Sequence, residues 1–227
     1  MSLAIDVRGL RFRYGNGPWI LDIGELTLER GTRAFLFGPS GSGKTTLLGV
    51  LAGVLAATEG EVRVLGEDLA ALSGAKRDAF RAEHIGYVFQ MFNLIPYLSV
   101  LDNIALPARM DAKRRARLDG AGVKETAALL ADHLHIGDLL KKPVTELSVG
   151  QQQRVAACRA LIGSPEIIVA DEPTSSLDFD RREAFLRLLF QECERAGSTL
   201  VFVSHDRTLE GMFSRTISLP DINKAAF

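Results

Sequence analysis

The residues best suited to do chemistry stand in short runs along the chain. The first run, at 38–45, reads Gly-Pro-Ser-Gly-Ser-Gly-Lys-Thr. It matches the pattern GxxxxGK[ST], in which backbone N–H groups curl around phosphates, the lysine reaches the terminal phosphates and the hydroxyl holds magnesium. An apolar stretch at 32–37 predicts a buried strand before the run, and 45–51 predicts the start of a helix after it. Phosphates would lie at the positive end of that helix.

An acidic pair follows another apolar strand. Residues 167–170 read Ile-Ile-Val-Ala, and Asp171 and Glu172 come next. Ligands of open α/β sheets bind outside the carboxyl ends of the strands. Asp171 can therefore help Thr45 to hold a magnesium ion that bridges terminal phosphates, while Glu172 can polarise a water molecule beside them. An exposed acidic pair before a turn at Pro173 is the plainer alternative.

A third run makes the pattern specific. With Leu147-Ser148-Val149-Gly150-Gln151 the chain resembles the ATP-binding cassette (ABC) ATPases, whose signature is Leu-Ser-Gly-Gly-Gln. Other P-loop ATPases share the first loop and the acidic strand end, but not a signature about a hundred residues after the lysine. The resemblance spans nearly the whole chain. It implies an ATPase that uses ATP and Mg²⁺.

The resemblance also implies a role for each matching residue. Glu172 becomes the catalytic base, His205 the group that hydrogen-bonds the terminal phosphate, and Gln90 the group that senses magnesium and the attacking water. The metal ligands would be Thr45, Gln90 and Asp171. The ATP-binding residues would be Tyr14, which stacks on adenine, together with Gly38, Pro39, Ser40, Gly41, Ser42, Gly43, Lys44, Thr45, Thr46, Ser148, Gly150 and Gln151.

Some of these residues have simpler readings. Tyr14 alternates with Phe12 as strand residues do, so it could belong to the core, and Trp19 or Phe12 would then face the base. Gln90 could be a plain polar strand end. Three other histidines receive no chemical role: His84 precedes a strand, while His133 and His135 stand two apart on a predicted helix and do not share a face.

Ser148 is a predicted N-cap whose hydroxyl and neighbouring N–H groups could bind an anion. The resemblance implies a head-to-tail homodimer, in which each ATP is clamped between the 38–45 loop of one copy and the signature of the other. Residues 175–178 resemble the loop that crosses this interface, although 180–183 could form a capping box. Val149, where the family usually has glycine, costs little in a first helical turn with negative φ.

Composition predicts one compact unit. At 227 residues the chain can bury a substantial core, and its net charge of −1 with dispersed basic residues argues against a nucleic-acid partner. Cys158 and Cys193 lack metal-ligand spacing, and the chain starts without a secretion signal, so we expect a reducing cytoplasm. No stretch approaches the roughly eighteen apolar residues that span a bilayer, so a membrane role requires a partner.

Apolar periodicity predicts an α/β fold. Alternation near 5–7, 12–14, 26–28 and 62–64 predicts half-buried strands, whereas 85–89, 167–170 and 200–203 read as parallel strands. The clearest predicted helices are 124–135 and 151–161. With the resemblance, this predicts a P-loop NTPase (RecA-like) parallel-sheet core, an N-terminal antiparallel β subdomain and a helical signature subdomain. Within the single domain 1–227, we expect residues 1–89 and 164–227 to form the β subdomain and the RecA-like core. Residues 90–163 are expected to form the helical subdomain.

Residues 92–100 and 102–107 look like the lipoprotein-release and macrolide-efflux (MacB/LolD-type) branch, which works with FtsX-like permeases. This implies an ATP-hydrolysing subunit at the inner face of the cell membrane that energises a separate permease for export or lipoprotein extrusion. An amino-acid or phosphonate importer is one alternative. A soluble ABC ATPase is another, although such proteins usually carry a coiled-coil insertion or two cassettes. Residues 113–115 with Arg117 predict a solvated helical face.

Overall fold

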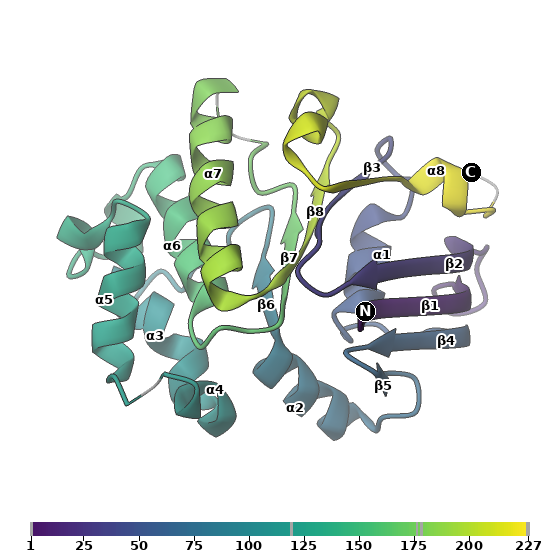
Figure 1. Cartoon of the computed structure of the whole chain (residues 1–227), viewed down its shortest axis with the longest axis horizontal. Coiled ribbons are helices and arrows are strands. Elements are labelled where there is room, and N and C mark those ends of the chain that lie inside the picture. Colours follow the sequence, from purple (N-terminus) through teal and green to yellow (C-terminus); the bar gives the residue numbers. More distant parts are fainter. Residues whose placement is uncertain (1, 119, 176, 178, 226–227) are drawn as a thin grey trace. The chain divides into compact units, whose positions relative to one another are not determined.

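The computed structural model describes residues 2–118, 120–175, 177 and 179–225, with the backbone alone at 179 and 180 (Figure 1). The chain forms two compact units. One comprises Met1–Arg81 with Thr199–Phe227, and the other Ala82–Ser198.

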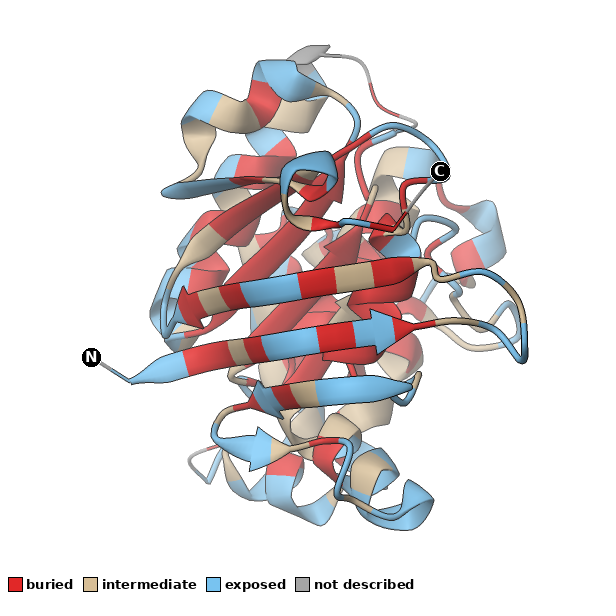
Figure 2. Cartoon of the chain, turned by 90° about the vertical axis from the view of Figure 1, so that its right-hand side faces the viewer, coloured by how far each residue is buried: buried red, intermediate tan, exposed pale blue. Residues whose placement is uncertain are grey.

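The first unit begins with an antiparallel sheet in the order β2-β1-β4-β5. Its strands are β1 (Leu3–Phe12), β2 (Leu21–Glu29), β4 (Glu59–Val64) and β5 (Glu67–Asp68). Figure 2 shows buried and exposed residues alternating along the two long strands, β1 and β2. Because successive side chains of a strand point to opposite faces, this alternation places one face of the sheet in a core.

A parallel sheet in the same unit buries the large side chains of Phe35 and Phe202. Strand β3 (Arg33–Phe37) lies between β8 (Thr199–Ser204) and β9 (Arg215–Ser218). The ring of Phe35 packs against Phe202 and Phe213, with centroids 6.3 and 5.1 Å away. The helical elements of these sequence regions are α1 (Lys44–Leu51), α2 (Gly74–His84), η3 (Arg207–Met212) and α8 (Leu219–Ile222). Strand β8 is buried throughout, as expected of a covered parallel strand.

The second unit pairs β6 (Ile85–Val88) in parallel with β7 (Ile167–Asp171). Its helices are α3 (Val100–Met110), α4 (Ala112–Ala116), α5 (Val123–His133), η1 (Gly137–Leu139), η2 (Val144–Glu146), α6 (Val149–Leu161) and α7 (Phe179–Ala196). Helix α6 packs closely on β6, because a Cβ at Gly86 would lie only 2.2 Å from the carbonyl oxygen of Ala160. None of the described helices combines the length and apolar content needed to cross a membrane.

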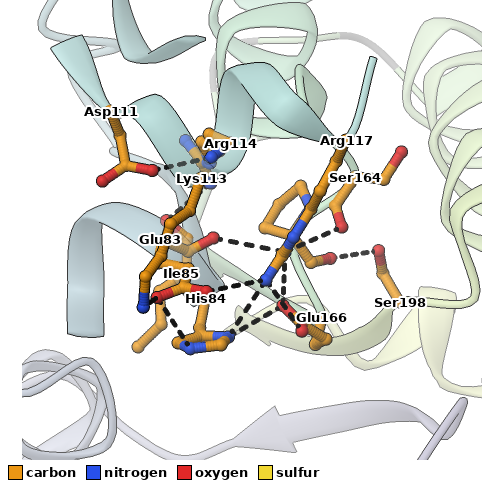
Figure 3. Close-up of polar contacts among 11 residues, drawn as sticks. Glu83, His84, Ile85, Asp111, Lys113, Arg114, Arg117, Ser164, Glu166 and Ser198 are labelled. Atoms are coloured by element: carbon orange, nitrogen blue, oxygen red, sulfur yellow. Dashed lines mark hydrogen bonds and ion pairs between the residues drawn. The ribbon is translucent and has the colours of Figure 1, made fainter. Parts of the chain in front are cut away.

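These elements confirm the predicted α/β class, with its antiparallel opening, parallel strands and helical middle segment. One surface prediction is wrong. The basic run at 113–117 is not a uniformly solvated face, because Arg114 is only 3% exposed and donates a hydrogen bond to the carbonyl oxygen of Ile85 at 3.0 Å (Figure 3). Burial lowers the pKa of Arg114 to about 10. The number of charged residues in a run does not reveal that one long arginine side chain can reach a buried backbone carbonyl.

Arg117 is also partly buried, at the centre of a charged cluster (Figure 3). Its guanidinium donates to both carboxylate oxygens of Glu166, at 2.8 and 3.1 Å. His84 Nδ1 lies 3.1 Å from the same carboxylate, and Glu83 accepts from Lys113 at 2.6 Å. The cluster therefore ties the end of α2 and the α4 region to the residue that precedes β7.

We expect Glu166→Gln to lower Tm by about 2–4 °C at pH 7, because it removes a two-pronged ion pair. Burial by itself would raise the pKa of Glu166, but hydrogen bonds from Arg117 and His84 outweigh it and hold that pKa below its usual value. A carboxyl with a lowered folded-state pKa stabilises the fold above its unfolded pKa of about 4.3, and this contribution disappears as the pH falls through the folded value.

Thermal unfolding of wild type and Glu166→Gln from pH 7 down to about pH 3.5 checks this expectation. The difference in Tm should shrink as the pH falls below about 4. Glu146→Gln, at an exposed glutamate of the same unit, should leave Tm nearly unchanged throughout. A difference for Glu166→Gln that stays constant over this range would contradict an ionic contribution.

Candidate functional site

The loop between β3 and α1 has the shape of a phosphate cradle, within the first unit. Gly43, its last residue, has φ +91°, and a Cβ there would lie 3.0 Å from a methyl carbon of Leu21. Only glycine fits this position without strain. The Lys44 ammonium donates to the carbonyl oxygens of Gly38 and Pro39, both at 2.8 Å. The loop therefore folds around its own lysine, beside the start of α1.

Ser42 adds a second sign of a ligand site. Its residue is 2% exposed, and its hydroxyl finds no hydrogen-bond partner among the described residues. Buried hydroxyls are normally paired. An oxygen-rich anion held by the loop would satisfy this group, so the residues present fit a bound polyphosphate.

Asn223, which the sequence analysis did not single out, holds this loop in place. It is 5% exposed, and its amide donates to the carbonyl oxygens of Ile20 at 3.0 Å and Ser42 at 3.4 Å. Its oxygen accepts from the N–H of Asp22 at 2.7 Å. One side chain near the C-terminal end thus joins β2 to the phosphate loop. No spacing rule marks a lone asparagine for such a role.

Tyr14 lies beside the same loop. It follows β1 instead of lying within it, is 58% exposed, and its hydroxyl is 3.4 Å from Thr46 Oγ1. The core alternative for Tyr14 is therefore wrong, because Phe12 occupies the buried position. Trp19 instead packs against the guanidinium of Arg13, 4.6 Å from its ring centroid. Tyr14 presents an exposed aromatic face near the loop, which suits stacking on a base.

His205 lies at the same strand edge as the loop. Ser204, the last residue of β8, pairs with Phe37, the last residue of β3, so His205 and Gly38 leave the sheet side by side. His205 is exposed. Asp206 shapes the following turn by accepting from the N–H of Thr208 at 3.0 Å. The first unit therefore brings together Tyr14, the phosphate loop and His205.

In the second unit, Gln90, Asp171 and Glu172 meet at one edge of the β6–β7 pair. Val88 pairs with Ala170, so Asp171, which ends β7, lies at the same sheet edge as Glu172 and Gln90, which follow β7 and β6. Asp171 is 7% exposed. The pKa of Tyr87 on β6 is raised by the burial of its own hydroxyl and by the nearby negative charge of Asp171. Glu172 has φ +43°. A left-handed glutamate costs of order 1–3 kcal/mol, and such strain concentrates at functional sites.

The signature begins α6, as predicted. Ser148 is the N-cap: its hydroxyl accepts from the N–H of Gln151 at 3.4 Å, and the Gln151 side chain accepts from the N–H of Ser148 at 2.9 Å. This reciprocal pair is a capping box. Val149 is the first helical residue, is about half exposed and does not have positive φ. Valine therefore fits this position without backbone strain.

Helix α6 also holds two loops that lie beside site residues. Gln153, 1% exposed, donates to the carbonyl oxygen of Pro173, which follows Glu172, at 2.8 Å. Arg159 donates to the carbonyl oxygens of Phe92 at 2.5 Å and Asn93 at 2.7 Å, in the loop after Gln90. Burial lowers the pKa of Arg159. The sequence placed Gln153 after the signature but gave no indication of which carbonyls α6 would reach.

A cavity of about 430 Å³ opens at the start of α6. Its described lining residues are His135, Ser148, Gly150, Gln151, Gln153, Arg154, Leu177, Arg181 and Phe185. The sequence analysis predicted that His135 lies on a helix, but α5 ends at His133 and His135 has φ +57°. A left-handed non-glycine residue costs about 1–2 kcal/mol.

Ser176, Asp178 and the Asp180 side chain lie outside the described residues, so the predicted interface loop and capping box are only partly seen.

The sequence matches the ABC transporter family over residues 21–175. The chain is 34% identical to the lipoprotein-releasing system ATP-binding protein LolD of Porphyromonas gingivalis over 219 residues, which cover 96% of this chain and 97% of that one. It is 36% identical to the macrolide export ATP-binding/permease protein MacB of Rhodopirellula baltica over 220 residues, which cover 96% of this chain and 32% of that protein.

The fold is similar to solved structures of MJ0796, a bacterial ABC transporter cassette, with a TM-score of 0.83 and 33% identity over 94% of this chain and 93% of the other. MJ0796 has been solved as a dimer, and also as a dimer in a post-hydrolysis state bound to ADP and inorganic phosphate.

Proposed function

This chain belongs to the ABC transporter family, and we propose that it binds and hydrolyses ATP to energise a separate membrane permease of the MacB/LolD type. One observation carries the proposal: a chain with a folded phosphate loop also carries a capped signature helix with its own cavity. The relatives favour the export and lipoprotein-release branch over an importer or a soluble ABC ATPase. Residues 90–163 would form the helical subdomain of one ABC ATPase domain, 1–227, and 1–89 with 164–227 the remainder.

ATP would bind in the first unit. Tyr14 stacks on the base, and the N–H groups of the loop with Lys44 hold the phosphates. The buried Ser42 hydroxyl supports this assignment, because a polyphosphate would satisfy it. Magnesium, when bound, neutralises charge on the terminal phosphates. The Thr45 hydroxyl, the Asp171 carboxylate and the Gln90 amide would supply hard oxygen ligands of the kind that suit it.

Glu172 would orient the attacking water and accept its proton, and His205 would donate a hydrogen bond to the terminal phosphate. The left-handed backbone of Glu172, followed by a proline carbonyl that Gln153 holds, limits the directions in which its carboxylate can point. Hydrolysis then depends on a base that is positioned before ATP arrives. Preorganisation of this kind lowers the cost of reaching the transition state.

Two copies would pair so that Ser148, Gly150 and Gln151 of one complete the ATP site of the other. The dimeric cassette MJ0796 supports this homodimer. The permease partner would dock at the cytoplasmic face of the membrane. MacB joins ATP-binding and permease functions in one protein, and this similarity supports a permease as the partner of this chain.

Purification of the tagged chain from its native membranes, followed by reconstitution with any copurifying permease in vesicles, tests the proposal. We expect a permease with a large extracytoplasmic domain to copurify and to change the rate of magnesium-dependent ATP hydrolysis. Lys44→Ala, which cannot hold the phosphates, should abolish the activity of the reconstituted complex. Robust ATP hydrolysis that no membrane protein alters would instead favour the soluble class.

A further inference from the structure

The C-terminal end of α5 has a histidine where local geometry favours glycine. The N–H of Ile136 donates to the carbonyl oxygen of Ala131 at 2.8 Å, and the N–H of His135 donates to that of Asp132 at 3.0 Å. This is the arrangement in which a helix ends at a left-handed residue, usually glycine. His135 takes that position with φ +57°. The chain thus has an imidazole side chain at a position where glycine would adopt the backbone conformation with less strain.

The position of His135 is fixed against the signature helix. Helices α5 and α6 lie in contact in the second unit (Figure 1). The guanidinium of Arg154, one turn beyond Gln151 on α6, donates to the carbonyl oxygen of Leu134 at 3.0 Å. Since Leu134 immediately precedes His135, this bond anchors the end of α5 beside the N-terminus of α6. His135 therefore lines the same cavity as Ser148, Gly150 and Gln151.

The cavity is suited to an anion. Among its described lining residues, Arg154 and Arg181 are positively charged, His135 offers ring nitrogens, and none is acidic. The N–H groups at the start of α6 add the positive end of a helix dipole. His135 is exposed, and its imidazole makes no hydrogen bond or ion pair within the described part of the chain. A ring nitrogen is therefore available to donate to a ligand that enters the cavity.

We propose that His135 is a further ATP-contacting residue, which donates a hydrogen bond from its imidazole to the polyphosphate of the ATP held by a second copy of the chain. The proposal rests on the proposed function, because it takes the signature face to be completed by the phosphate loop of another copy. It adds to that face a residue that lies on α5, outside the signature. Arg154 acts as a positioning residue, since it reaches the backbone before His135.

ATP-dependent dimerisation in a Glu172→Gln background tests the proposal, because slow hydrolysis lets the ATP-bound dimer accumulate. Light scattering after size exclusion, over a range of Mg-ATP concentrations, gives the half-saturating concentration. We expect His135→Gly to raise it by about tenfold, since a lost hydrogen bond to a charged group has roughly this effect on binding. His135→Asn, which tolerates the left-handed backbone and keeps an N–H donor, should recover part of the loss.

A second readout separates this contact from a structural role. His135→Gly should raise Tm by about 2–4 °C, because glycine relieves the left-handed strain. Binding of a fluorescent ATP analogue by the monomer should stay unchanged, because the contact forms only across the dimer. Ser164→Gly is the matched control: Ser164 is also left-handed, with φ +47°, and does not line the cavity. It should raise Tm similarly and leave dimerisation unchanged.

Dimerisation of the His135→Gly protein at the same ATP concentration as its parent would overturn the proposal while leaving the proposed function intact. An equal loss in the Ser164→Gly protein would also overturn it, since backbone relief alone would then explain the effect. A parent Glu172→Gln protein that stays monomeric at saturating Mg-ATP would refute the paired site itself, and the His135 contact with it.

Discussion

Glu172→Gln is expected to lower ATP hydrolysis by about a thousandfold, within the range that a general base contributes. The glutamine keeps the size of the side chain but cannot accept a proton from water. Glu172 sits at the carboxyl end of β7, next to the buried Asp171, and its backbone is left-handed. Because the substitution leaves Asp171 and the phosphate loop intact, ATP binding should persist.

Release of inorganic phosphate, measured with and without magnesium, gives the rate, and a fluorescent ATP analogue gives the affinity. The mutant should bind the analogue within about twofold of wild type while its turnover is nearly absent. Glu194→Gln, an exposed glutamate on α7, is the control and should keep wild-type turnover. Hydrolysis by Glu172→Gln at a tenth of the wild-type rate or more would mean that another group activates the water.

The second large effect is expected from Asn223→Ala. Removal of this buried amide leaves the carbonyl oxygens of Ile20 and Ser42 and the N–H of Asp22 without their partner. Each unsatisfied buried group costs about 1–3 kcal/mol, and partial access of water to the site reduces the sum, so we expect a loss of about 2–4 kcal/mol in the free energy of unfolding. Because the Ser42 carbonyl belongs to the phosphate loop, ATP affinity should also fall.

Asn103→Ala provides a matched comparison for this result. Asn103 is fully buried in the second unit, where its amide donates to three carbonyl oxygens and its oxygen accepts from the N–H of Ile95 at 2.8 Å. Urea unfolding should show that both substitutions destabilise the protein. Binding of the ATP analogue, measured well below either Tm, should weaken only for Asn223→Ala. Equal ATP affinity in the two variants would show that Asn223 stabilises the fold without shaping the loop.

Local patterns in the sequence predicted most elements near the site. The strands at 85–89 and 167–170 are β6 and β7, and the helix predicted at 151–161 is part of α6. These predictions succeeded because apolar periodicity and capping act over a few residues. The predicted helix at 124–135 extended two residues too far, because a periodic pattern does not mark where a left-handed residue ends the helix.

The contacts that hold the site together could not be predicted in this way. Asn223 reaches the phosphate loop across 181 residues of sequence, and Gln153 reaches Pro173 across 20. Arg117 was assigned to a solvated face, yet it forms a two-pronged pair with Glu166. Each contact depends on which backbone groups the tertiary fold leaves unpaired, and one sequence carries no local sign of that.

Helix α6 connects several separate segments of the second unit. Its 13 residues form a rod about 20 Å long. Ser148 stands at one end, Gln153 and Arg154 grip the loops at Pro173 and Leu134, and Arg159 grips the loop after Gln90. If the helix moves as a rigid body, a displacement at one of these contacts displaces the others as well. On the proposed function, a nucleotide bound at Ser148 and a displacement of the loop after Gln90 would act on the same helix, so neither change would be independent of the other.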